Sequence, residues 1–148
     1  MIAVQFPEPQ FKTKIRDGKR YIFDPIRRSW LLLTEEEWVR QNVVAFLVKS
    51  LRYPAAHLAL EKEVQVNGLP KRFDLLVYNG DHQPWMLVEC KAPGIALSED
   101  VLQQVLRYNM ATPVCFLVIT NGRHTLAWEK KSGELTALQQ WPQWPASE

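Results

Sequence analysis

The sequence predicts an α/β fold in which a mixed β-sheet is flanked by helices. Apolar residues recur at helical spacing between residues 34 and 49, whereas apolar and polar residues alternate between residues 58 and 66. A nearly all-apolar run from Val114 to Thr120 is typical of a strand at the centre of a sheet that is covered on both faces. Along the chain, the order is helix, three strands, helix and two further strands, which favours this architecture.

Length and composition indicate one folding unit. The chain has 148 residues, of which 47% are hydrophobic and 23% charged, as in an ordinary globular domain. The net charge of +2 is too small to indicate a nucleic-acid binder by itself. No apolar run approaches the ~20 residues of a membrane span, and no export signal is visible, so we expect a cytoplasmic protein without membrane contact.

The first 33 residues are expected to form a peripheral β extension that packs on a core of residues 34–148. Asp17-Gly18 separates two short strand-like stretches, as in a hairpin. Residues 1–28 also hold more basic than acidic residues, for which a solvated face is favoured over a phosphate-facing strip. The basic residues are Lys12, Lys14, Arg16, Lys19, Arg20, Arg27 and Arg28.

The first helix should begin after Thr34 and continue to about Lys49. Thr34 with Glu37 three residues later forms a capping box, in which hydroxyl and carboxylate satisfy unpaired backbone N–H groups. Tyr53-Pro54 lies beyond its end. The buried stripe should consist of Trp38, Val39, Val43, Phe46 and Leu47.

Three strands follow as an antiparallel meander. The period-two stretch 58–66 ends at the turn Asn67-Gly68, and 72–78 reads as the returning strand. A second turn at 79–81 leads to the strand 85–91. Two turns of this length place the three strands side by side.

A second helix and two strands complete the expected core. Ala92-Pro93-Gly94 breaks the third strand, and Ser98 begins a helix that runs to about Met110. Its buried stripe should consist of Val101, Leu102, Val105 and Leu106. The apolar strand 114–120 then turns at Asn121-Gly122 into 124–129. Cys90 and Cys115 lie in strand-like runs without metal or disulfide spacing, so both are expected to be buried.

Two charged residues lie unexpectedly at the end of the strand 85–91. Because side chains alternate along a strand, Glu89 and Lys91 point to the same side. Asp74 interrupts the neighbouring apolar strand and can lie beside Glu89. Two adjacent carboxylates repel each other unless a cation lies between them, and hard oxygen ligands suit Mg²⁺ or Mn²⁺. The sequence therefore predicts a metal site.

This site would support phosphodiester hydrolysis. Asp74, Glu89 and the backbone carbonyl of Cys90 could hold Mg²⁺ (or Mn²⁺) with several waters. Lys91 could orient or deprotonate the attacking water, or neutralise charge on the phosphorus.

Asp74, then Glu89-Cys90-Lys91 followed by Ala-Pro, between a leading and a trailing helix, resembles the PD-(D/E)XK nuclease superfamily. Within that superfamily, the closer resemblance is to the N-terminal nuclease domain of type I restriction enzyme R subunits, in a short stand-alone bacterial form, over roughly residues 20 to 130. The resemblance implies a restriction-endonuclease-like core of order αβββαβ acting on DNA. Phe73 replaces the proline of the motif's name, as in many members.

The resemblance implies three more site residues. An acid on the first helix often completes the metal site, with Glu37 preferred and Glu36 second. Gln104 and Tyr108, four residues apart, match a Gln-xxx-Tyr motif beside the site in recombination-type members. Capping explains Glu37 equally well, Gln104 can be an ordinary solvent-facing residue, and Tyr108 can be a rim residue of the core.

Two functions remain open. The first is a Mg²⁺-dependent endonuclease-like domain acting on DNA, and the alternative is a catalytically silent nuclease-fold module that binds nucleic acid or a protein partner. Since we see no DNA-recognition region in the sequence, we expect targeting by another chain, such as a restriction or repair subunit. The oligomeric state, a homodimer included, is left open. His57, His82 and His124 lack ligand spacing, and Trp141 and Trp144 have no assigned role.

Overall fold

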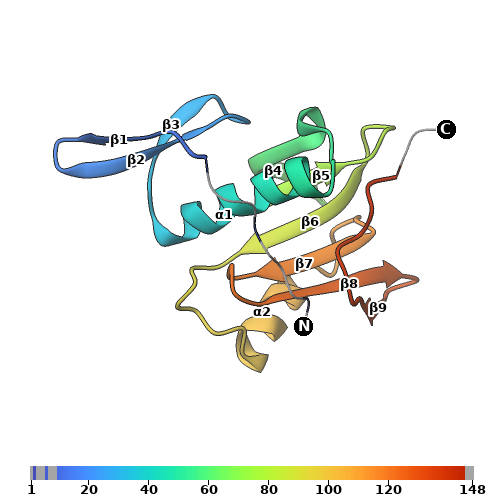
Figure 1. The fold of residues 1–148 in the computed structure, drawn as a ribbon. Helices are drawn as coiled ribbons and strands as arrows, with labels where there is room; N and C mark the ends of the chain where they lie inside the picture. The colour runs from blue at the N-terminus through green and yellow to red at the C-terminus, as the bar shows by residue number, and fades with distance from the viewer. Residues whose placement is uncertain (1, 3–5, 7–9, 146–148) are drawn as a thin grey trace.

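The computed structural model describes residues 2, 6 and 10–145 and has an α/β fold built on a six-stranded mixed sheet (Figure 1). The strand order is β4-β5-β6-β7-β8-β9, and every neighbouring pair is antiparallel except the parallel pair β6 and β7. The predicted fold class and meander are confirmed. The strands are β4 (Leu58–Val66), β5 (Leu69–Tyr78), β6 (Pro84–Cys90), β7 (Phe116–Thr120), β8 (Thr125–Lys131) and β9 (Glu134–Ala137).

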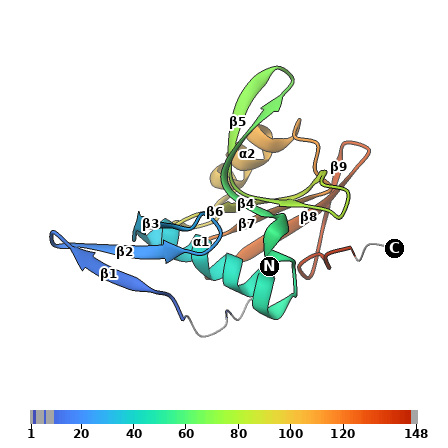
Figure 2. The same cartoon turned by 90° about the horizontal axis from the view of Figure 1, so that it is seen from above.

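Two helices cover opposite faces of this sheet (Figure 2). On one face lies α1 (Glu35–Ala45), which continues into a π-helical turn (Phe46–Ser50), and on the other lies α2 (Glu99–Asn109). A 3-10 turn (Ala55–His57) leads into β4. Alternate residues of β5 and β6 divide between two apolar clusters, since Leu75 packs with Val39 of α1 while Leu76 packs near Leu106 of α2. The sheet is therefore buried on both faces, as predicted for its central strands.

The β4 and β5 hairpin is long and bends out of the plane of the sheet toward α2 (Figure 2). Its turn residues Asn67 and Gly68 both have positive φ, at 52° and 78°, which is the type I′ geometry expected of Asn-Gly. Lys71 of β5 lies over the ring of Tyr108 in α2, with its Nζ atom 4.8 Å from the ring centroid. The bend thus joins the hairpin to α2.

A separate three-stranded antiparallel sheet precedes α1. It consists of β1 (Thr13–Arg16), β2 (Lys19–Asp24) and β3 (Ser29–Leu32), and we call residues 13–32 the arm. Both views show the arm projecting from the body on the side where α1 begins (Figures 1 and 2). The hairpin turn at Asp17-Gly18 is confirmed, whereas β3 and β9 were not anticipated.

Some individual predictions need correction. Cys90 is buried, but Cys115 is exposed, so the expectation of two buried thiols is wrong. The reason is that β7 begins only at Phe116, and the backbone of Cys115 pairs with Trp85 and Lys130 while its side chain remains outside the core. Within the described ranges, no helix has the length and apolar character to span a membrane.

The C-terminal tail closes over the core. The ring of Trp141 is buried 5.5 Å from Phe46, and the indole N–H of Trp144 donates a hydrogen bond to the carbonyl of Tyr78 at 3.0 Å. Its ring also lies beside that of His57. These contacts give the tail a packing role.

Candidate metal centre

Asp74 and Glu89 lie where strands β5 and β6 separate. The antiparallel ladder pairs Leu76 with Leu87 and Leu75 with Val88, so the next residues along, Asp74 and Glu89, face each other. Asp74 does not continue the backbone ladder, and instead its Oδ2 accepts a hydrogen bond from the backbone N–H of Cys90 at 2.9 Å. The carboxylate of Asp74 therefore occupies the opening between the two strands.

The charge of Asp74 acts strongly on the carboxyl group of Glu89 across the opening. Burial, followed by the negative charge of Asp74, raises the pKa of Glu89 to about 8. Without a cation, burial and the nearby charge of Asp74 thus favour the protonated form of Glu89. A group of two close, partly buried carboxylates is an arrangement that a divalent cation would stabilise.

Lys91 lies two residues after Glu89 in the chain and carries an amine. Its backbone N–H donates to the carbonyl of Thr120 at 2.8 Å, which ties the residue to β7 just beyond the end of β6. Its positive charge acts on both Glu89 and Glu36, lowering the pKa of each against the larger effects that raise them. Asp74, Glu89 and Lys91 therefore lie in one neighbourhood.

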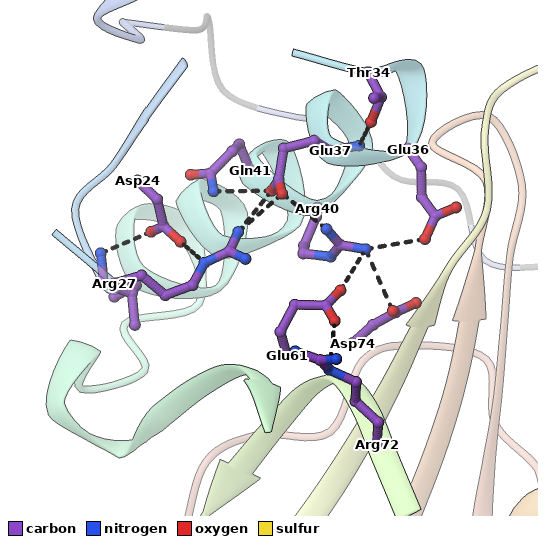
Figure 3. Close-up of polar contacts among 11 residues, drawn as sticks. Asp24, Arg27, Thr34, Glu36, Glu37, Arg40, Gln41, Glu61, Arg72 and Asp74 are labelled. Carbon is purple, nitrogen blue, oxygen red and sulfur yellow. Dashed lines mark hydrogen bonds and ion pairs between the residues drawn. The ribbon is translucent and has the colours of Figure 1, made fainter. Parts of the chain in front are cut away.

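Glu37, the preferred helix acid in the sequence, is engaged elsewhere (Figure 3). Both oxygens of its carboxylate accept a hydrogen bond from Arg27 at 2.9 Å. The carboxylate also accepts one from Arg40 at 2.8 Å and one from Gln41 at 3.2 Å. Its backbone N–H donates to Thr34 Oγ1 at 3.0 Å, so one half of the capping box is formed. The other half, a hydrogen bond from the Thr34 N–H to the carboxylate of Glu37, does not form, because the Thr34 N–H donates to the carbonyl of Leu32 instead.

Glu36 is the helix acid whose charge reaches the pair. Burial raises the pKa of Glu36, and the charge of Asp74 raises it further. The charge of Glu36 in turn raises the pKa of Glu89. Of the two acids considered from sequence, Glu36 is the one that the fold turns toward Asp74 and Glu89.

Arg40 is a central residue that the sequence did not single out. Its side chain is only 7% exposed and forms ion pairs with four carboxylates, through Nη1 to one and through Nη2 to three (Figure 3). The partners are Glu37 at 2.8 Å, Glu36 at 2.9 Å, Glu61 at 3.0 Å and Asp74 at 3.3 Å. Its spacing of three and four residues from the two helix acids was visible in the sequence, but its contacts with β4 and β5 were not.

Further ion pairs extend from this cluster on both sides. Arg27 joins Glu37 to the buried Asp24 at the end of β2, which links the arm to α1. On the other side, Glu61 also pairs with the exposed Arg72 at 3.1 Å. Alternating charges therefore run from the arm to the opening between β5 and β6.

Gln104 and Tyr108 lie on the exposed side of α2, where they line a shallow hollow with Asp100, Gln103 and Arg107. Tyr108 is 46% exposed and its backbone carbonyl accepts a hydrogen bond from Lys71. In the part of the chain that the structure describes, neither side chain bonds to Asp74, Glu89 or Lys91. The structure therefore does not bring Gln104 and Tyr108 against the two acids.

The donor atoms at the opening fit a hard cation that keeps part of its water shell. Among residues 2, 6 and 10–145, no three His, Cys, Asp or Glu side chains form a ready metal cage. The available ligands are the carboxylates of Asp74 and Glu89 and the carbonyl of Cys90, which points to the same strand edge as its N–H. Two carboxylates and a carbonyl, completed by water, are ligands typical of Mg²⁺.

Comparison with known families assigns the chain to a family. The model for "Type I restriction enzyme R protein N terminus" matches residues 35–142, which include both helices and all six strands of the main sheet. The arm lies outside the matched range. No curated protein sequence matches the chain.

Proposed function

Because the chain belongs to the family of type I restriction enzyme R protein N termini, we propose that it is a divalent-metal-dependent deoxyribonuclease domain. Asp74, Glu89 and Lys91 are its proposed catalytic residues. The observation that carries the proposal is the β5 and β6 register, which sets Asp74 opposite Glu89 at the opening between the strands, with Lys91 two residues further along the chain.

Asp74, Glu89 and the carbonyl of Cys90 would hold the Mg²⁺ or Mn²⁺ ion. Such an ion, when bound, polarises a phosphoryl oxygen and lowers the pKa of a bound water. Lys91 orients the attacking water, or neutralises charge on the phosphate, for which a compact ammonium group is suited. Glu36 replaces Glu37 as the proposed helix acid, because Glu37 is held by two arginines and Gln41.

The proposed substrate is DNA, and the proposed partners are other restriction or repair subunits. Gln104 and Tyr108 are proposed to contact the DNA from the exposed side of α2 rather than to bind the ion, since they stand apart from the acids. Cleavage then depends on Asp74, Glu89 and Lys91 and is only modulated by this pair.

Plasmid nicking tests the proposal. The wild-type protein should nick supercoiled plasmid with Mg²⁺ or Mn²⁺ and not with EDTA. Lys91→Ala should slow nicking by roughly 10²-fold or more, which is the usual effect of losing a group that acts on the proton or charge of the reaction. The matched control is Lys62→Ala, since Lys62 is an exposed lysine of β4. Equal nicking by both variants would remove the mechanism.

A catalytically silent module is the second candidate, and two observations favour it. The described residues hold no three-ligand cage, and Arg40 already supplies a positive charge to Asp74. Calorimetry with Mn²⁺ separates the candidates, because the nuclease should bind the ion and lose that binding in Asp74→Asn. A protein that binds no Mn²⁺ at millimolar concentration is the silent module.

A further inference from the structure

One face of the arm combines basic and aromatic side chains. Directly paired residues of antiparallel strands point to the same face. The register pairs Lys14 with Tyr21, and Tyr21 with Leu32, while Arg16 pairs with Lys19. The complete face, which we call the basic face, consists of Lys12, Lys14, Arg16, Lys19, Tyr21, Phe23, Trp30 and Leu32.

This face carries positive charge without a compensating acid on its strands. The acids of the arm are Asp17, which lies in the hairpin turn, and Asp24, which is fully buried and paired with Arg27. Asp24 belongs to the opposite face, with Ile22. Among the residues that the structure describes, none forms an ion pair with the lysines or the arginine of the basic face, so these cations can meet an external anion.

The aromatic rings of the basic face are held in place but remain partly open. Trp30 is 38% exposed and contacts the ring edge of Phe23 at a centroid distance of 5.4 Å. The ammonium of Lys14 lies 4.3 Å above the indole ring. A hollow on this face is lined by Lys14, Arg16, Asp17, Tyr21 and Trp30. A ligand that offers both negative charge and a flat ring would complement this hollow.

The arm is connected to the candidate metal centre. Its last strand leads directly into the first turn of α1, which carries Glu36. The ion pairs from Asp24 through Arg27 to Glu37 fix the base of the arm against that helix (Figure 3). The arm therefore projects from the same side of the body as the start of α1 (Figure 1).

Charged residues on an outlying strand usually serve to prevent aggregation through its edge. That role explains the lysines but not three aromatic residues on the same face, one of them an exposed tryptophan. Phosphates attract the cations, and bases stack on aromatic rings with little dependence on sequence. We propose that the basic face of the arm binds single-stranded DNA, with Arg16 and Lys19 on phosphates and Trp30 under a base.

This inference rests on the proposed function only for the choice of DNA, because binding by the arm needs no metal ion. Fluorescence anisotropy with a labelled single-stranded oligodeoxynucleotide, in EDTA and over a range of salt concentrations, measures it. The double variant Arg16→Glu with Lys19→Glu should bind at least tenfold more weakly. The slope of log K against log salt concentration should also become shallower by about 1.4, because each lost phosphate contact on a single strand contributes roughly 0.7 to that slope.

The matched control is Arg52→Glu with Lys131→Glu, which changes the net charge equally at two exposed residues outside the arm. It should weaken binding less than threefold. Trp30→Leu should weaken binding roughly tenfold and leave the salt dependence unchanged, because a stacked base contributes about 1–3 kcal/mol without releasing a counterion. Thermal unfolding verifies that each variant is folded, and Arg16→Gln with Lys19→Gln replaces the charge reversal if that variant is not.

Equal weakening by the arm variant and the control would overturn the inference, since binding would then be diffuse attraction. Absence of binding by the wild-type protein would overturn it as well. Binding is measured in EDTA, in which the proposed metal-dependent cleavage does not occur. If the protein does not nick plasmid but the arm variant binds the oligonucleotide more weakly than the control does, only the proposed nuclease activity is refuted. If the protein nicks plasmid but the arm variant and the control bind equally, only the role of the arm is refuted.

Discussion

At the scale of residues, the structure depends on how buried charges are paired. Arg40 is nearly inaccessible to solvent, yet it contacts carboxylates from α1, β4 and β5. A buried ion is costly unless hydrogen-bonded counterions surround it, and removal of one partner leaves the others uncompensated. Arg40 therefore joins three elements and also offsets the negative charge beside Glu89.

Arg40→Met should lower the free energy of unfolding by about 3–5 kcal/mol, because its acids would be left without their shared cation. Urea denaturation measures this difference. The matched control is Arg72→Met, since Arg72 is 70% exposed and pairs with Glu61 at the surface. An exposed pair contributes at most about 1 kcal/mol. Similar losses in the two variants would contradict the role of Arg40.

The raised pKa of Glu89 predicts how stability depends on pH. The folded protein holds a proton on Glu89 up to about pH 8, whereas the unfolded chain releases it near its ordinary value of 4.5. Folding therefore takes up a proton between these values, and stability should fall as pH rises through that range. Urea denaturation in EDTA from pH 5 to 9 measures the slope.

Two variants separate Glu89 from other titrating groups in this pH series. Glu89→Gln should flatten the slope between pH 5 and 8, whereas Glu99→Gln, at an exposed position in α2, should leave it unchanged. The same slope in all three proteins would mean that Glu89 is not the group that takes up the proton.

At the scale of elements, the helix ends were legible in the sequence. Thr34 caps α1 through a 3.0 Å bond to the N–H of Glu37, and Ser98 caps α2 through a longer bond of 3.4 Å to Val101. Each cap satisfies a backbone donor that has no partner within the helix.

Thr34→Ala should therefore lower the free energy of unfolding by about 1 kcal/mol, within the usual effect of losing an N-cap. Ser98→Ala should have a smaller effect, because its bond is near the limit of a useful distance. Thermal or urea unfolding of the two variants measures which one loses more unfolding free energy. A larger loss for Ser98→Ala would show that cap geometry does not determine the stability of these helices.

The long strands and both helices could be predicted because periodicity and Asn-Gly turns act locally. The short strands β3 and β9 have only four residues each, too few for a period to stand out. The choice between Glu36 and Glu37 was beyond local rules. Neighbouring helical residues point about 100° apart, so the rotation of α1, set by packing of Val39 and Val43, decides which acid turns toward the sheet.

At the scale of the whole molecule, the candidate metal centre combines residues from α1, β5 and β6. The turn at residues 79–81 was enough to predict that Asp74 and Glu89 lie on adjacent strands, and the register sets them opposite each other. The sequence could not predict that the ladder opens at Asp74, nor that Arg40 reaches across from α1. Those features depend on how a helix docks on the sheet.

The central claim is that Asp74 and Glu89 together hold a divalent cation. A crystal structure with Mn²⁺ tests it most directly, because the anomalous signal of the ion locates it without reference to activity. The account predicts a peak in coordination distance of both carboxylates, with the guanidinium of Arg40 withdrawn from Asp74, and no peak in Asp74→Asn. If the opening shows no anomalous peak at saturating Mn²⁺ and the ion pair between Arg40 and Asp74 remains intact, the claim is contradicted.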